Sequence, residues 1–148
     1  MASVDPDYDL VVEAYSAIWP RYERHGFAGL NDQERTIFCT WQFVCEVNNG
    51  GVHQFFFNPS GEFAKETVEA LEKVEMPYAA SLLKRALEAF PNLAKDHRTR
   101  AEQLLSLSEC VQKDLFNELT GAFFDSPEDP YVLQAAYVRR NLASFPGL

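Results

Sequence analysis

Apolar residues recur three and four positions apart along most of the chain, which is the spacing of one face of an α-helix. The densest run has apolar side chains on most sides of the helix: Ile37, Phe38, Trp41, Phe43, Val44, Cys45 and Val47. A helix that is apolar nearly all round is buried, so we expect this one at the centre of the fold. No stretch alternates polar and apolar residues over the length of a strand. The pattern predicts one compact all-α domain over residues 1–148, with about six to eight helices.

Start and stop signals place the first two helices. A helix over residues 8–18 is expected to end near Pro20, because proline removes a backbone hydrogen bond. Asn31 and Glu34 have the spacing of a capping box, which predicts the start of the central helix. The asparagine-glycine segment 48–51 is expected to end that helix, and at least one of its glycines to have a positive φ.

The second half of the chain is predicted to hold the remaining helices. One runs over residues 62–74, with Ser60 as its N-cap. Pro77 suits the first turn of the next. Residues 101–119 form one long helix or two, and the last helix starts near residue 129.

Charge excludes some classes of function. The 148 residues include 13 Lys and Arg against 22 Asp and Glu, a net charge of −9. Direct binding to nucleic acid or to an anionic membrane depends on basic side chains, so we expect neither. Residues 1–83 carry a net −8, residues 84–100 carry +3 and residues 101–148 carry −4. Two acidic zones therefore flank one basic stretch.

Cysteine use and the first residues bear on location and cofactors. Cys39, Cys45 and Cys110 are an odd number without a CxxC pair, and their apolar neighbours predict structural thiols. The first residues are acidic where a signal peptide needs a basic start, and no apolar run has the length of a membrane span. The histidines are scattered and no phosphate-binding loop occurs. We expect a cytoplasmic protein without a metal or cofactor.

Carboxylates at one-turn spacing are the candidates for binding a partner. Glu62, Glu66 and Glu69 stand at i, i+4 and i+7, which puts them on one face of the predicted helix. Such rows can engage the basic side chains with which another protein holds DNA phosphates. The alternative is a solvated face that maintains solubility. The full set is Glu62, Glu66, Glu69, Glu72, Glu109, Asp114 and Glu118.

A second group of polar residues surrounds the predicted end of the central helix. It comprises Glu46, Asn48, Asn49, Gly50, Gly51, His53 and Gln54. The favoured interpretation is structural: the glycines turn the chain and the polar side chains satisfy backbone groups, with no catalytic residue. The other interpretation is a pocket in which Glu46 is a base and His53 an acid. Asn48 or Gln54 would then donate to an oxyanion.

Residues 46–51, 54–58 and 60–61 together resemble a bacterial domain family, otherwise of unknown function, that is named for a DNA-mimic protein. The helix that ends at residues 90–91 is similar as well, so the resemblance covers residues 30–145. It implies an all-helical fold, a homodimer and binding to a DNA-binding protein such as a transcription regulator. It does not imply that every member mimics DNA, because the shared motif is internal whereas mimicry depends on surface carboxylates.

Three hypotheses of function follow. The leading one is a non-enzymatic acidic protein that binds a basic partner protein, in particular a DNA-binding protein, by mimicking the charge of DNA. The second is an inhibitor or immunity protein against a basic toxin or nuclease, which uses the same charge. The third is a small-ligand-binding protein or enzyme centred on residues 46–54. A pocket at the motif with Glu46 turned into it would favour the third.

Overall fold

Seven α-helices form most of residues 5–148, the part of the chain that the computed structural model describes. They are α1 (Pro6–His25), α2 (Asp32–Phe57), α3 (Ala64–Lys73), α4 (Pro77–Leu87), α5 (His97–Leu105), α6 (Phe116–Phe124) and α7 (Pro130–Arg140). Three short 3-10 turns and one π-helical turn join or follow them: η1 (Phe27–Gly29), η2 (Pro59–Phe63), η3 (Cys110–Leu115) and η4 (Leu142–Ser144). The described residues form no strand, so the prediction of a compact all-α domain is confirmed.

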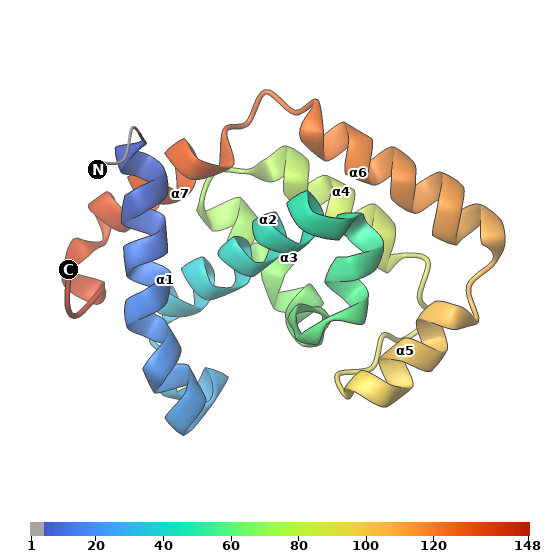
Figure 1. The fold of residues 1–148 in the computed structure, drawn as a ribbon, viewed down its shortest axis with the longest axis horizontal. Coiled ribbons are helices and arrows are strands. Elements are labelled where there is room, and N and C mark those ends of the chain that lie inside the picture. Colours follow the sequence, from blue (N-terminus) through green and yellow to red (C-terminus); the bar gives the residue numbers. More distant parts are fainter. Residues whose placement is uncertain (1–4) are drawn as a thin grey trace.

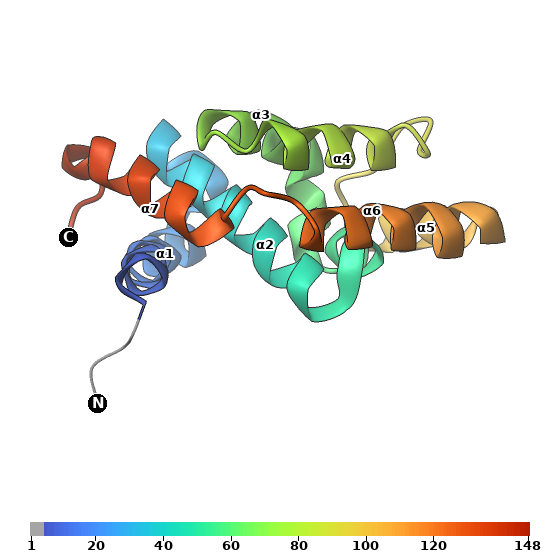
Figure 2. The same ribbon diagram turned by 90° about the horizontal axis from the view of Figure 1, so that it is seen from above.

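Helix α2 is the central element, as its apolar pattern predicts. It packs against α1, α3, α5, α6 and α7. In Figure 1 it runs from beside α1 toward the middle of the molecule, and Figure 2 shows α3 and α4 on one side of it with α1 on the other. Its start carries the predicted capping box: Asn31 Oδ1 accepts from the Glu34 amide at 2.8 Å, and Glu34 Oε1 accepts from the Asn31 amide at 2.9 Å.

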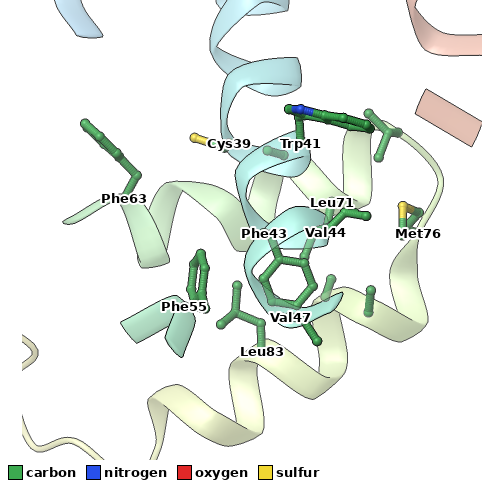
Figure 3. Close-up of a cluster of buried hydrophobic side chains, with 14 of the residues drawn as sticks. Cys39, Trp41, Phe43, Val44, Val47, Phe55, Phe63, Leu71, Met76 and Leu83 are labelled. Carbon is green, nitrogen blue, oxygen red and sulfur yellow. The ribbon is translucent and has the colours of Figure 1, made fainter. Parts of the chain in front are cut away.

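The core lies where α2 meets α3 and α4. Phe43 and Val47 of α2 lie beside Leu71 of α3 and Leu83 of α4, and all four are buried (Figure 3). The ring of Phe43 also meets Phe55 edge-on, with ring centroids 5.1 Å apart. Each such side chain removed from water contributes about 1.5–3 kcal/mol. These contacts hold both parts of α2 against the α3–α4 pair.

The prediction that the first helix ends near Pro20 is wrong. Helix α1 passes through Pro20 and ends at His25, where Gly26 takes a φ of 70° and its amide donates to the Tyr22 carbonyl. Proline in a helix removes one backbone hydrogen bond. The residues after Pro20 offset this loss because their side chains pack on other helices. The ring of Tyr22 lies 4.4 Å from that of Phe38 on α2, and this contact favours continuation of the helix.

The start of α3 also differs from the prediction. Ser60 is not its N-cap: it lies in η2, and its hydroxyl donates to the Phe55 carbonyl at 2.8 Å. Helix α3 begins only at Ala64, so Glu62 precedes it. Residues 101–119 divide among α5, η3 and α6, and the expected starts of α4 at Pro77 and of α7 at Pro130 are confirmed.

No helix within residues 5–148 is long and apolar enough to cross a membrane. The expectation of no signal peptide depends mainly on the first residues, and residues 1–4 lie outside the described part of the chain.

Candidate functional site

The backbone bends at Gly51, inside α2. Gly51 has φ 82° and ψ −175°, a conformation that is essentially restricted to glycine. The Val52 amide after it donates to Oγ1 of Thr120 at 3.0 Å, which ties the bend to α6. A positive φ in this glycine pair is therefore confirmed. The expected end of the helix is instead a bend, because the chain is helical again up to Phe57.

Glu46 joins the two sides of this bend. Its Oε2 accepts hydrogen bonds from Gln54 Nε2 and from Asn58 Nδ2, each at 2.8 Å. Glu46 lies before Gly51, whereas both amide groups come after it. The two bonds fix the position of the half-buried carboxylate, and they use only one of its two oxygens.

The other polar residues of the motif do not gather around Glu46. Asn48 donates to the Tyr131 hydroxyl at 3.3 Å and lines a different hollow beside α7. Asn49 and His53 are exposed. Gly50 lies so close to Gln54 that an added Cβ would meet Gln54 Oε1 at 1.8 Å. The arrangement with His53 as acid opposite Glu46 is not assembled. Of the structural interpretation, the turn of the chain at the glycines is found, whereas Glu46, Asn48 and Gln54 bond to other side chains instead of to backbone groups.

Arg100 supports the end of the bent helix, a role that the sequence did not indicate. It is buried on α5, and its guanidinium donates to the carbonyls of Phe56, Asn58 and Lys95 at 2.7, 3.0 and 2.6 Å. In the sequence it counts as one base of the stretch 84–100. No signal in a single sequence distinguishes it from the exposed Arg98 two positions earlier.

A hollow of about 310 Å³ lies between α1 and α2 beside Glu46. Aromatic side chains form much of its wall, together with Glu46, Cys45 and Gln42. Its lining residues are Tyr15, Trp19, Trp41, Gln42, Cys45, Glu46, Pro59 and Ser60. Gln42 Nε2 donates to the Tyr15 hydroxyl at 3.0 Å, which fixes one edge. Partial burial and the nearby Glu46 raise the pKa of Cys45 to about 11, so its thiol is neutral at physiological pH.

Most carboxylates of the predicted partner-binding set already form ion pairs within the chain. Glu66 meets Lys95 at 2.8 Å, and Glu72 meets Lys84 at 3.0 Å. The remaining pairs are Glu69–Lys73, Glu109–Lys113 and Glu118–Arg85. Glu62, on η2, and Asp114, on η3, are exposed and form no ion pair within residues 5–148. These two are the members of the set that a partner meets without displacing a neighbouring base.

A row of carboxylates on α1 was missed in the sequence. Asp9, Glu13 and Glu23 are exposed on this helix and form no ion pair in the described part of the chain. Asp9 and Glu13 are four residues apart, so their side chains are neighbours on one face. The same spacing rule that selected Glu62 and Glu66 would have found them.

The cysteines differ from one another. Cys39 is buried, and burial raises the pKa of its thiol to about 12. Cys45 and Cys110 are exposed, so the prediction that all three are structural thiols in apolar surroundings is wrong for these two. Within residues 5–148 no group of three or more His, Cys, Asp or Glu residues could hold a metal ion.

Comparison with known proteins gives one result. The family described as DMP19-like protein matches residues 28–141, which agrees closely with the extent of the resemblance noted in the sequence. No curated protein and no solved structure matches the chain. The matched residues include the bend in α2, Glu46 and its two amide donors, and Arg100. Because the match covers well over half of the chain, this protein belongs to the DMP19-like protein family.

Proposed function

We propose that this protein is a non-enzymatic binding protein whose acidic surface occupies the DNA-binding surface of a basic partner protein. The observation that carries the proposal is its membership of the DMP19-like family, which is named for a DNA mimic. The net charge of −9 supports it, because a DNA-binding protein presents arginines and lysines placed for phosphates. A transcription regulator is the kind of partner that we expect.

The distribution of ion pairs supports the same proposal. Within residues 5–148, every exposed base except Arg24 and Lys65 is paired with a carboxylate of the chain. The surplus carboxylates therefore dominate the field that an approaching protein meets. Such a field accelerates encounter with a basic partner and is weakened by salt.

Two surfaces compete as the contact region. The first is the predicted set around Glu62, Glu66 and Glu69, which lies within the family match. The second is the α1 row with Asp9 and Glu13, which lies outside the match and would be particular to this chain. Exposed ion pairs contribute only about 0–1 kcal/mol each, so Glu69 can exchange Lys73 for a base of the partner, whereas Glu66 has one oxygen buried and the other on Lys95.

The test is a pair of triple variants with the same change in charge. One is E62Q/E66Q/E69Q and the other is D9N/E13Q/E23Q, and each removes three negative charges. Proteins retained by the immobilised wild-type chain at low salt and released at high salt are identified from a lysate of the source organism. The affinity of a retained DNA-binding protein is then measured for the wild type, both variants and duplex DNA, at two salt concentrations.

We expect competition with DNA, a clear loss of affinity at higher salt and a larger loss for the first variant than for the second. A larger loss of affinity for D9N/E13Q/E23Q than for E62Q/E66Q/E69Q would indicate that the partner contacts α1. Simultaneous binding of the partner to DNA and to this chain would contradict the proposal. So would equal affinities of all three chains at both salt concentrations, because the acidity would then serve only solubility. A captured toxin or nuclease would favour the inhibitor hypothesis.

A further inference from the structure

We propose that the hollow between α1 and α2 is a binding site for an organic cation. An ammonium or guanidinium head group would pair with Glu46 and lie against Trp19, Trp41 and Tyr15. This site is separate from the acidic surfaces of the proposed function, and neither proposal depends on the other.

The first argument is the state of Glu46. Its Oε2 is held by the amides of Gln54 and Asn58, whereas its Oε1 forms no hydrogen bond within residues 5–148. Neutral amides orient the carboxylate without cancelling its charge. The hollow is lined by Glu46 and by no basic residue of the described chain. In this respect Glu46 differs from Glu66 and Glu72, whose charges are balanced by nearby lysines.

The second argument is the aromatic wall. Both tryptophans of the chain, Trp19 and Trp41, line the same hollow, and Tyr15 stands one turn before Trp19 on α1. Trp19 keeps 38 % of its surface exposed, so its ring is accessible to a ligand. Aromatic faces attract cations, and tryptophan does so most strongly. An anion would be repelled by Glu46, and a neutral apolar ligand would neither balance its charge nor donate a hydrogen bond to its Oε1.

The third argument concerns which cation fits. A volume of about 310 Å³ is at the lower end of the range for small-molecule sites. Divalent metal ions require several oxygen ligands, and Glu46 is the only carboxylate that the described residues bring to the lining. A single organic head group needs one carboxylate and an aromatic surface. The ligand is therefore either a free small cation or an arginine or lysine side chain of a bound protein.

The experiment uses the fluorescence of the two tryptophans, since both line the site. The purified full chain is titrated with ethylguanidinium and with ethylurea, its neutral counterpart, at constant ionic strength. A capped tripeptide with a central arginine and the same peptide with citrulline form the second pair. A saturable change is expected with the two cations at about millimolar concentration, and none with their neutral counterparts.

The variant E46Q tests the role of the carboxylate. The glutamine oxygen can still accept from Gln54 and Asn58, so the bend is kept while the charge is lost. We expect cation binding to weaken by about tenfold or more. E88Q is the matched control, because Glu88, the C-cap of α4, is exposed, forms no ion pair within residues 5–148 and lies far along the chain. It removes the same charge and is expected to leave the affinity unchanged.

The variant W19L is a second test that does not depend on Glu46. It leaves Trp41 as the reporter, and we expect about threefold weaker cation binding. Tighter binding of the arginine peptide than of ethylguanidinium would identify a protein side chain as the source of the cation. Equal binding of the two would identify a free small molecule as the source. Equal responses to ethylguanidinium and ethylurea would overturn the proposal. Equal weakening by E46Q and E88Q would overturn it too, because binding would then follow net charge alone.

Discussion

The guanidinium of Arg100 passes directly over Gly61. A Cβ on Gly61 would stand 2.6 Å from Arg100 Nε and 2.4 Å from the Phe56 carbonyl oxygen. Glycine is therefore required at position 61 by the close approach of the end of α2 and of Arg100 on α5, although its backbone is not in the left-handed region. The contact joins η2 to α5 and holds the chain that carries Asn58, one of the two donors to Glu46.

Gly61→Ala should destabilise the fold by about 1–3 kcal/mol, because the Phe56 carbonyl cannot move away without disturbing the end of α2. Urea unfolding followed by circular dichroism measures this loss. Gly121→Ala is the control: nothing lies within 4 Å of the added Cβ, and Gly121 is inside α6. A gain of about 0.5–1 kcal/mol is expected there. An unchanged midpoint for Gly61→Ala would contradict the close approach.

Arg100→Lys should lose about 2–4 kcal/mol of stability. An ammonium cannot reach the three carbonyls that the fork of the guanidinium reaches, and a buried carbonyl without a donor is costly. Arg98→Lys provides the comparison, since Arg98 is exposed and, among residues 5–148, forms an ion pair with Glu102 alone, at 3.7 Å. Its effect should stay within about 0.5 kcal/mol. A loss for Arg100→Lys as small as that for Arg98→Lys would mean that the positive charge of Arg100 matters and its three hydrogen bonds do not.

Gly51→Ala should cost about 1–3 kcal/mol, because the backbone there is in a region that L-residues avoid. Gly50→Ala acts differently: its Cβ would stand 1.8 Å from Gln54 Oε1, which can rotate away, and 2.9 Å from Gln54 Cβ, which cannot. We expect Gly50→Ala to lower the stability as well, and to remove the hydrogen bond from Gln54 to Glu46. Thermal unfolding measures the loss for each variant. If neither changes the melting temperature, the glycine pair has no structural role.

Cys45 should react slowly with iodoacetamide at neutral pH. Partial burial and the negative charge of Glu46 both favour the neutral thiol and raise its pKa to about 11. Below that pH the thiolate fraction, and with it the alkylation rate, should rise about tenfold for each pH unit. Peptide mass spectrometry measures the rate. A plateau near pH 9 would contradict the raised pKa.

The same shift links stability to pH. A cysteine in the unfolded chain ionises near pH 8.5, whereas in the fold Cys45 remains protonated up to a higher pH. The stability that the neutral thiol contributes is therefore complete below about pH 8.5 and is lost as the pH rises towards 11. Cys39, with a pKa raised to about 12, acts in the same direction.

We also expect the chain to form a homodimer, which the resemblance to the DNA-mimic family implies. Val132 of α7 and Leu142 after it are exposed apolar residues, and Arg139 and Arg140 near them are paired with Asp7 and Glu75. This mixed surface avoids the repulsion that two strongly acidic faces would cause. Sedimentation at high protein concentration and moderate salt should show a dimer, and Val132→Asp should shift it towards monomer. A monomer for the wild type under these conditions would exclude the dimer.

The fold was predictable because its signals are local. The capping box at Asn31 and Glu34, the proline starts of α4 and α7 and the apolar face of α2 all depend on residues within a turn or two of one another. The predicted helix ends were wrong where contacts between residues far apart in the sequence, or backward along it, determine the structure. Helix α1 continues past Pro20 because Tyr22 packs on Phe38 of another helix. Ser60 bonds backward to Phe55 instead of capping α3.

The site was predictable only in part. The composition of the motif located Glu46 and Gln54, but not the fact that they bond to each other across a bend. Trp19 and Trp41 stand on different helices, so no spacing rule brings them to one hollow. The pairing of Glu66 with Lys95 likewise spans elements far apart in sequence. Charge counted along the chain therefore overstates the number of free carboxylates.

The position of α2 has a consequence for how the molecule opens. This one helix packs against α1, α3, α5, α6 and α7, so unfolding of α2 would remove packing contacts from all five (Figures 1 and 2). The backbone amides of residues 36–47 should therefore exchange with deuterium only through global unfolding. Leu105, at the end of α5 opposite the buried Arg100, is 77 % exposed, so we expect local opening to begin at this end of the helix.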